Sequence, residues 1–167
     1  MRVASLADAP GICEIANHYI RHTTISFNDI EKTADTIEAD IAASQTNGLP
    51  YLVSADGATL HGFATCTPFR KGSGYRFTLE HTILLAPDRT GQGRGSALLL
   101  ALQNVLADTA VHTLIAGISA ENQNAVAFHT RHGFAEVGRI AQAGVKFDRL
   151  IDLILMQKRL SSARANR

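Results

Sequence analysis

The stretch TLEHTILLAPDRTGQGRGSALL, residues 78–99, places three alternate glycines between a hydrophobic run and a leucine-rich one. Glycine loses more conformational entropy on folding than any other residue, so this cluster needs a physical reason. The first run has the alternation of a strand, and the second has the spacing of a helix that begins near Gly93. Gly91, Gly93 and Gly95 are therefore predicted to lie where a strand passes into a helix.

A glycine-rich loop in this position is typical of an anion-binding site. Several backbone N–H groups converge there, and the helix dipole is positive at the same end. Arg89 and Arg94 add positive charge beside the loop. A tight turn is the alternative, but a plain turn rarely needs three alternate glycines. The stretch lacks the lysine of a P-loop and the spacing of a dinucleotide fingerprint, so we predict a pyrophosphate site of another kind.

Composition restricts the class of protein. The chain has 167 residues, of which 46% are hydrophobic and 19% charged, as in ordinary soluble globular domains. A net charge of +1 gives no electrostatic reason to expect a nucleic-acid or membrane partner. Cys13 and Cys66 lie in apolar segments and make no disulfide framework, so we expect a reduced, cytoplasmic protein. We predict one domain over residues 1–160 and a disordered tail over residues 161–167.

Hydrophobic periodicity and turn residues predict the other elements. Asp8 is placed to cap a first helix, with Pro10 in its first turn, and Asp56 and Gly57 supply the turn of a hairpin. In chain order we expect a strand over 1–6, a helix after Asp8, a helix over 34–44, a hairpin over 50–69, a strand over 75–85, a helix over 93–108, a strand over 114–119, a helix that ends at Gly133, and strands over 135–140 and 147–156. This order predicts an α/β fold, a mixed sheet flanked by helices.

Two segments together resemble the acetyl-CoA signature of the GNAT N-acetyltransferase superfamily: DRTGQGRGSALL (88–99) and ENQNAVAFHTRHGF (121–134). Three more resemble the branch of phosphinothricin and methionine sulfoximine N-acetyltransferases. They are ANHYIRHTTISF (16–27), YRFTLEHTILL (75–85) and VGRIAQAGVKFDRLIDLILMQ (137–157). The resemblance implies a twisted, mostly antiparallel mixed sheet with a V-shaped split between two parallel strands, at about 77–85 and 114–119.

The resemblance also implies where acetyl-CoA binds as a co-substrate. Its pyrophosphate would lie on the backbone amides of Gly91, Gln92, Gly93, Arg94, Gly95 and Ser96. Its pantetheine arm would pair with the backbone of Ile83, Leu84 and Leu85, and an N–H near Leu84 would stabilise the oxyanion. Asn122 matches an asparagine that contacts the cofactor, and it is equally suited to cap the following helix.

Acetyl transfer to an amine needs a base, because an α-amine with a pKa of about 8 is mostly protonated at pH 7. Glu80 is our candidate, since alternation places it opposite the apolar face of its strand and the resemblance assigns it that role. An ion pair with Arg76 is the alternative. His81 falls on the apolar face, where a core histidine is favoured over a base, and the resemblance places it near the substrate. His129 stands where many members have a tyrosine, and it is suited to protonate the thiolate, to hold a water or to pack.

Substrate contacts follow from the resemblance. Arg70, Lys71 and Gly72 would line the pocket, and Tyr75 and Arg76 would flank it, although a solvated basic loop is the alternative. Phe27 and Thr82 complete the expected contacts, and the alternative for Phe27 is a core position. The segment around Lys146 and Phe147 would close over the substrate or a dimer partner. The departures from the pattern are Thr90 and Ala125, near the cofactor, and Leu84 and Leu150, near the pocket.

The sequence thus predicts an enzyme that moves acetyl from acetyl-CoA to the α-amine of a small amino acid or analogue, by direct attack in a ternary complex. Phosphinothricin, methionine sulfoximine and methionine sulfone represent this substrate class, and a homodimer is implied. The alternatives are an acetyltransferase for protein N-termini or another small amine, and a non-catalytic module that senses acyl-CoA. We expect no metal, because the pairs His18/His22 and His129/His132 have no third ligand nearby in sequence.

Overall fold

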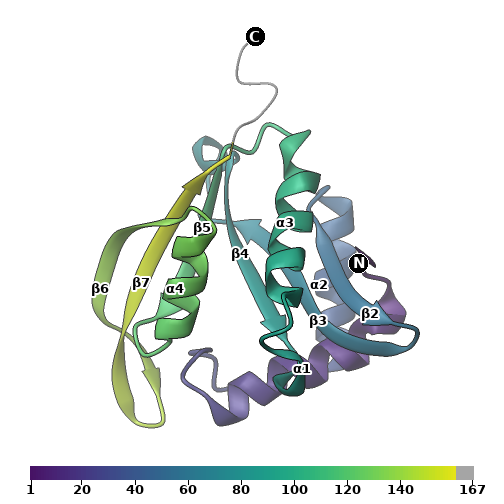
Figure 1. The fold of residues 1–167 in the computed structure, drawn as a ribbon, viewed down its shortest axis with the longest axis horizontal. Coiled ribbons are helices and arrows are strands. Elements are labelled where there is room, and N and C mark those ends of the chain that lie inside the picture. Colours follow the sequence, from purple (N-terminus) through teal and green to yellow (C-terminus); the bar gives the residue numbers. More distant parts are fainter. Residues whose placement is uncertain (161–167) are drawn as a thin grey trace.

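The computed structural model describes residues 1–160, in which seven strands form one mixed sheet with helices on both faces (Figure 1). In chain order the elements are β1 (Arg2–Val3), α1 (Ala9–His22), α2 (Ala34–Thr46), β2 (Tyr51–Asp56), β3 (Thr59–Pro68), β4 (Thr78–Leu85), α3 (Arg94–Ala107), β5 (Thr113–Ser119), α4 (Gln123–Arg131), β6 (Ala135–Lys146) and β7 (Arg149–Arg159). The tail predicted over residues 161–167 lies outside the described residues.

The sheet has the order β1-β2-β3-β4-β5-β7-β6, and β4 with β5 is its parallel pair. This pair is short, because it joins Thr78, Leu79 and Glu80 to Thr113, Leu114 and Ile115 and then ends. Beyond Glu80, β4 continues along β3 while β5 continues along β7, so the two strands diverge (Figure 1). The predicted α/β fold and the predicted split between two parallel strands are both confirmed.

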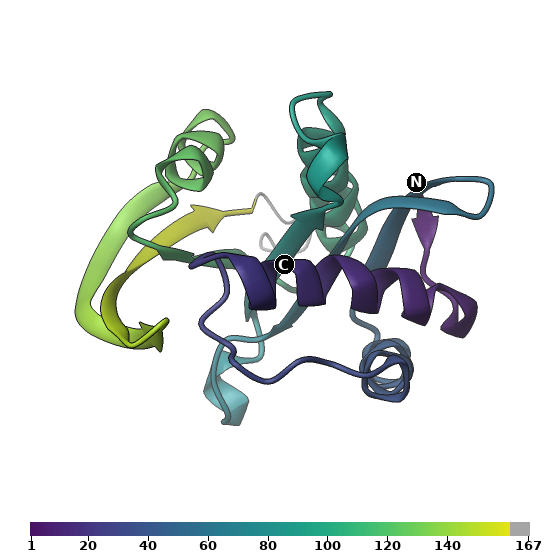
Figure 2. The same cartoon turned by 90° about the horizontal axis from the view of Figure 1, so that it is seen from below.

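Helices cover the two faces of the sheet in pairs, α1 and α2 on one side and α3 and α4 on the other (Figure 2). The core beneath α3 contains four leucines of that helix with inward residues of β3, β4, β5 and β7. The core beneath α1 and α2 contains isoleucines of both helices with Tyr51, Val53 and Phe63. Along β4, Leu79 therefore faces α3, whereas Leu84 packs toward α1.

The structure changes three local predictions. β6 extends to Lys146 instead of residue 140, because β7 pairs with it across a bulge over residues that show no alternation. The strand expected from residue 75 begins at Thr78, after a short 3₁₀ turn over Ser73–Tyr75. Asp8 precedes α1 as expected, but its carboxylate bonds Arg2 at 2.7 Å instead of a helix N–H. No helix among residues 1–160 is long and apolar enough to cross a membrane.

Candidate active site

The glycine loop lies at the N-terminus of α3 and leaves that end of the helix open. Gly91 and Gly93 have φ angles of 76° and 74°, in the left-handed region that favours glycine. A Cβ added to either residue would meet no atom within 4 Å, so the outer side of the loop is free of side chains. Gly93 precedes the helix without a side-chain cap, and the first N–H groups of a helix have no partner inside it.

Side chains around the loop are tied to other segments. Ser96 Oγ lies 2.9 Å from His132 Nε2, which joins the start of α3 to the end of α4. The Arg94 guanidinium lies 3.2 Å from Gln92 Oε1 and 4.0 Å from the carboxylate of Asp56. The contact between Ser96 and His132 had no counterpart in our sequence predictions, because the two residues belong to separate motifs.

A cavity of about 550 Å³ passes through the split in the sheet. On the α4 side it is lined by Asn122, Ala125 and His129, and on the α1–α2 side by residues of both helices and of β2 and β3. Six residues predicted for the site line it: His81, Thr82, Ile83, Leu84, Asn122 and His129. Asn122 also caps α4, because its side-chain oxygen accepts the N–H of Ala125 at 3.1 Å.

Glu80 lies where the parallel pairing ends. It is half-buried, and its carboxyl group rests on the backbone of Gly117 in β5. A Cβ at Gly117 would lie 2.6 Å from Glu80 Oε1, so this contact requires glycine. Burial raises the pKa of Glu80, and the positive charge of Arg70 partly offsets this. A carboxylate of raised pKa beside an open split is suited to accept a proton from an amine.

His81 and His129 form a buried pair on the opposite face of β4. Their Nε2 atoms are 3.0 Å apart, and the side chains are 7% and 8% exposed. His129 Nδ1 lies 2.7 Å from the Ala125 carbonyl, to which it must donate. A neutral His129 therefore offers a lone pair at Nε2, and His81 donates its Nε2–H to it. Burial and the neighbouring His129 lower the pKa of His81 to about 3, and burial also lowers the pKa of His129, so both rings are neutral near pH 7.

The predicted substrate loop lies beside this site with its side chains outside the cavity. The Arg70 guanidinium lies 5.2 Å from the Phe69 ring centre, while its charge reaches Glu80. The Arg76 guanidinium lies 4.3 Å over the Phe77 ring and donates to the Ser73 carbonyl at 2.9 Å. Among residues 1–160, the cavity lining includes none of the five predicted residues of this loop, which are Arg70, Lys71, Gly72, Tyr75 and Arg76.

The loop between α1 and α2 is held by the β6–β7 hairpin. Lys146 is 4% exposed, and its ammonium donates to the carbonyl of Ile20 at 2.6 Å and to that of Asn28. The ring of Phe27 packs directly on Gly144. Neither Phe27 nor Lys146 lines the cavity; both hold the segment that carries the lining residue Asn28.

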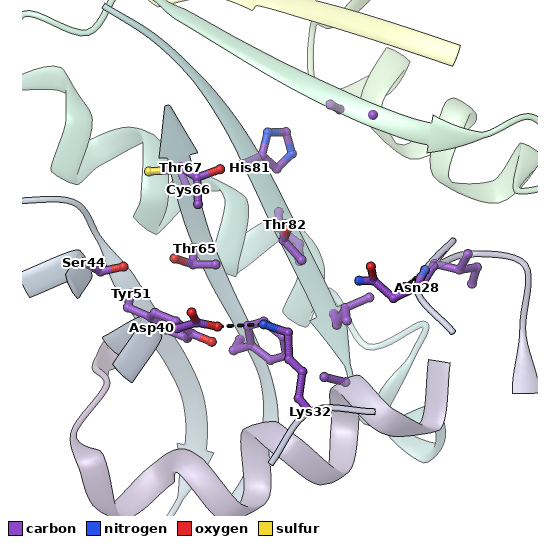
Figure 3. Close-up of a pocket in the computed structure, with 18 of the residues that line it drawn as sticks. Asn28, Lys32, Asp40, Ser44, Tyr51, Thr65, Cys66, Thr67, His81 and Thr82 are labelled. Atoms are coloured by element: carbon purple, nitrogen blue, oxygen red, sulfur yellow. Dashed lines mark hydrogen bonds and ion pairs between the residues drawn. The ribbon is translucent and has the colours of Figure 1, made fainter. Parts of the chain in front are cut away.

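Several polar residues of the cavity were missed in our sequence predictions. Lys32, Asp40, Ser44, Tyr51, Thr65 and Thr67 line it together with Asn28 (Figure 3). The sequence contains one indication of these residues, which is that the polar Asn17 interrupts the apolar stripe of the first helix. Asn17 is buried there and bonds the backbone of Lys32 at both its N–H and its carbonyl. Within the described part of the chain, no three histidine, cysteine or acidic side chains gather as metal ligands would.

A parallel pair that splits at a carboxylate, with a glycine loop at the next helix, defines a class of acyl-CoA-dependent transferases. Residues 1–155 match the family described as the acetyltransferase (GNAT) domain, and the chain belongs to this family. It is 36% identical over 160 residues to the L-amino acid N-acyltransferase of Escherichia coli K12, covering 96% of this chain and 93% of the relative. It is 37% identical over 163 residues to the phosphinothricin N-acetyltransferase of Alcaligenes faecalis, covering 97% and 83%.

Solved structures agree with this assignment. A Salmonella typhimurium protein solved with its cofactor acetyl-CoA has a TM-score of 0.93 at 34% identity, with 99% of this chain and 96% of that chain covered. A phosphinothricin acetyltransferase of Sinorhizobium meliloti, in complex with acetyl-CoA, has a TM-score of 0.92 at 28% identity, with 99% and 90% covered. The family prediction made from the two signature segments is confirmed.

Proposed function

We propose that this protein transfers the acetyl group of acetyl-CoA to the α-amine of a small amino acid or amino-acid analogue. One observation carries the proposal: the parallel pairing of β4 and β5 ends at Glu80, a half-buried carboxylate, and the cavity crosses the sheet just beyond it. A donor on the α4 side and an amine on the α1–α2 side can meet only at such an opening.

The residues on the α4 side fit acetyl-CoA. The backbone N–H groups from Gly91 to Ser96 would hold its pyrophosphate at the positive end of α3. The β4 edge at Ile83 and Leu84, which lost its parallel partner, would pair with the pantetheine arm. The carbonyl of Leu85 is already bonded by the hydroxyl of Tyr19 at 2.7 Å, so the free edge ends before it.

Glu80 would take one proton from the ammonium group of the substrate, which leaves a neutral amine to attack the acetyl carbonyl. The nitrogen would then lose a second proton to solvent as the C–S bond breaks and the thiolate leaves. An N–H of the free β4 edge near Leu84 would stabilise the oxyanion. We propose no acyl-enzyme. Burial raises the pKa of the Cys66 thiol to about 12, and the Cys13 thiol donates to the Lys32 carbonyl at 3.1 Å.

The buried pair restricts what His129 can do. Both ring nitrogens are engaged, one by the Ala125 carbonyl and the other by His81. A neutral imidazole in this state has no N–H left for the departing thiolate. We therefore propose that His129 and His81 form a neutral wall beside the thioester, with the proton of the thiolate supplied by solvent.

The names of relatives support the substrate class. Two are an L-methionine sulfoximine/L-methionine sulfone acetyltransferase of Salmonella typhimurium and the phosphinothricin enzyme of A. faecalis. We propose the same class of amino-acid analogues for this chain. One structural neighbour, from Brucella melitensis, is named a ribosomal-protein-alanine N-acetyltransferase, so peptides with free N-termini are the second candidate.

We further propose a cytoplasmic homodimer. The support for dimerisation is the outer strand β6, which pairs only with β7, and the exposed apolar side chains of this hairpin. They are Val137, Ile140, Val145, Phe147 and Leu150, each at least 46% exposed. Light scattering after gel filtration tests the dimer, and a monomer at micromolar concentration would contradict it. The two free cysteines support a reducing compartment.

Thiol release from acetyl-CoA tests the activity. The panel is methionine sulfoximine, methionine sulfone, phosphinothricin, common amino acids and short peptides, each with the wild type and with Glu80→Gln. We expect turnover of the amino-acid analogues that falls by at least about 100-fold in Glu80→Gln, while acetyl-CoA binding persists. Turnover of peptides alone would support the second candidate, and binding of acetyl-CoA without turnover of any amine would indicate a sensing module.

A further inference from the structure

Four polar side chains gather at the end of the cavity that is distant from the split. They are Lys32 before α2, Asp40 and Ser44 on α2, and Tyr51 on β2, and we call them the distal polar cluster. Lys32 Nζ lies 2.7 Å from Asp40 Oδ2, and this pair lies beside the Tyr51 ring (Figure 3). Neither the glycine loop nor Glu80 uses any of these groups.

The backbone of Lys32 is held in place before any ligand binds. Asn17, 6% exposed on α1, accepts the Lys32 N–H at 2.8 Å and donates to the Lys32 carbonyl at 2.9 Å. Because this buried amide bonds both the N–H and the carbonyl of one loop residue, it fixes the position of the Lys32 backbone. The Lys32 side chain therefore leaves the loop at a defined point above α2, which is the kind of preorganisation a binding site needs.

The cluster has hydrogen-bonding capacity that the protein leaves unused. Tyr51 is 4% exposed and Ser44 is 9% exposed, and both line the cavity. The ion pair uses one of the three ammonium protons and one of the two carboxylate oxygens. Burial, with the charge of Asp40, raises the pKa of Tyr51, so its hydroxyl keeps its proton and can donate. Because all four side chains border the cavity, a ligand bound there can reach these donors and acceptors.

The cluster lies on the same side of the sheet as Glu80, which borders the cavity lining through Thr82 and Gly117 without belonging to it. Tyr51, Thr65 and Thr82 are cross-strand neighbours, and Thr82 follows Glu80 by two residues on the same face of β4. In the plane of the sheet this is about 7 Å along the strand and about 10 Å across two strand spacings. The side chains of Glu80 and Lys32 shorten this gap from either end, so an amino acid with its amine at Glu80 extends its side chain toward the cluster.

The charge of the cluster determines what it accepts. Lys32 and Asp40 sum to zero, so an anionic group that approached Lys32 would also face the Asp40 carboxylate. An uncharged group that carries acceptor and donor atoms side by side satisfies both members of the pair. We propose that the distal polar cluster binds the side-chain end of the amino-acid substrate and selects uncharged dipolar groups, such as a sulfoximine or a sulfone, over an anionic phosphinate. This inference rests on the proposed acetyltransferase function.

The test compares kcat/KM for methionine sulfoximine, methionine sulfone, phosphinothricin and norleucine, whose side chain is apolar. The variants are Asp40→Asn, Lys32→Met and Tyr51→Phe. The control is Asp35→Asn, which removes the same charge from an exposed residue of α2 outside the cavity. Circular dichroism and thermal unfolding establish that each variant is folded before its kinetics are compared.

We expect the wild type to prefer the sulfoximine to phosphinothricin by about tenfold or more. Asp40→Asn should raise KM for the sulfoximine and reduce that preference by at least about fivefold, while KM for acetyl-CoA stays within about twofold. Lys32→Met and Tyr51→Phe should weaken the two polar sulfur substrates and leave norleucine unchanged. Asp35→Asn should behave as the wild type.

Three results overturn the inference, and they are distinguishable. If amino acids are acetylated with dependence on Glu80, but Asp40→Asn shows the same preference as Asp35→Asn, the cluster does not select the side chain and the proposed function stands. If no amino acid is acetylated by the wild type, the proposed function and this inference fail together. A wild type that prefers phosphinothricin also contradicts the inference.

Discussion

The glycine loop and the α1–α2 side of the cavity differ in how the chain builds them. The loop from Gly91 to Ser96 depends on consecutive residues, because two left-handed glycines give it its shape and it leads directly into α3. The α1–α2 side is assembled from distant segments. Asn17 holds Lys32, and Lys146 holds Asn28 from 118 residues away. The glycine loop is thus a local motif, whereas the α1–α2 side of the cavity exists only after the chain has folded.

Because of this difference, we expect that the binding of acetyl-CoA and the binding of the amine can be changed separately. A substitution in the glycine loop should alter the affinity for acetyl-CoA and leave the amine unaffected. A substitution in the contacts that hold the α1–α2 loop should do the reverse. A substitution at the split, between the two binding regions, should change the rate of acetyl transfer and leave both affinities unchanged.

Gly117→Ala tests the split. Its Cβ would lie 2.6 Å from Glu80 Oε1, so the carboxylate must move away from its position. We expect kcat to fall by about 100-fold, the typical cost of displacing a catalytic group by about 1 Å, with both KM values nearly unchanged. Steady-state kinetics with each substrate varied in turn measures this. Gly138→Ala is the matched control, because its Cβ meets no atom within 4 Å. Equal kinetics for the two variants would contradict the role given to Glu80.

Gly93→Ala tests the glycine loop. The residue has a φ of 74°, which costs an alanine about 1 kcal/mol, and relaxation of the loop would turn N–H groups away from the cofactor. We expect KM for acetyl-CoA to rise about tenfold with little change in KM for the amine. Gly74→Ala, in a loop with open space around the Cβ, should leave both unchanged. A parallel rise in both KM values in Gly93→Ala would show that the two binding regions are coupled.

Lys146→Met tests the α1–α2 side of the cavity. It removes the donor to the Ile20 and Asn28 carbonyls, which leaves a helix end and the cavity loop without their partner. We expect KM for the amine to rise about fivefold, KM for acetyl-CoA to stay unchanged, and stability to fall by about 2 kcal/mol. Kinetics and thermal unfolding measure these effects. Lys146→Arg should recover part of the amine affinity, and a loss confined to stability would reduce Lys146 to a structural role.

His81→Phe gives the smallest effect, which appears as a change in how stability depends on pH. The pKa of His81 is about 3 in the folded protein against about 6.5 unfolded, so the unfolded chain binds more protons between these values. The stability that the folded protein gains by keeping His81 neutral is complete above pH 6.5 and is lost as pH falls toward 3. At pH 5 we expect the wild type to have lost about 2 kcal/mol relative to pH 7 from this residue. His129, whose pKa is also lowered, acts in the same direction.

Thermal unfolding at pH 5 and pH 7 measures this loss. His81→Phe should show a smaller decrease between the two values than the wild type, and the exposed His22→Gln should show the wild-type decrease. Asp8 contributes little over this range, because its lowered pKa in the folded protein and the ordinary value of 3.8 in the unfolded chain both lie below pH 5. An identical decrease in all three proteins would mean that the buried histidine pair does not resist protonation.

Prediction from sequence succeeded where a residue's neighbours along the chain determine its structure. The alternation of β4 placed Leu79 and His81 in the core and left Glu80 on the other face, as the structure shows. Prediction from sequence failed where a contact with another element determines the structure. β6 continues to Lys146 because β7 lies beside it, and the Asp8 carboxylate turns to Arg2 instead of capping α1.

The family, the order of the elements, the glycine loop and the face on which Glu80 lies could all be predicted from the amino-acid sequence alone. These follow from local periodicity and from the conformational freedom of glycine, which neighbouring residues set. Only the tertiary structure decided that the parallel pairing stops at Glu80, that His81 meets His129, and that Lys32 and Asp40 end in one cavity. Such contacts join segments far apart in the chain, and their geometry arises only when the sheet twists and the helices pack on it.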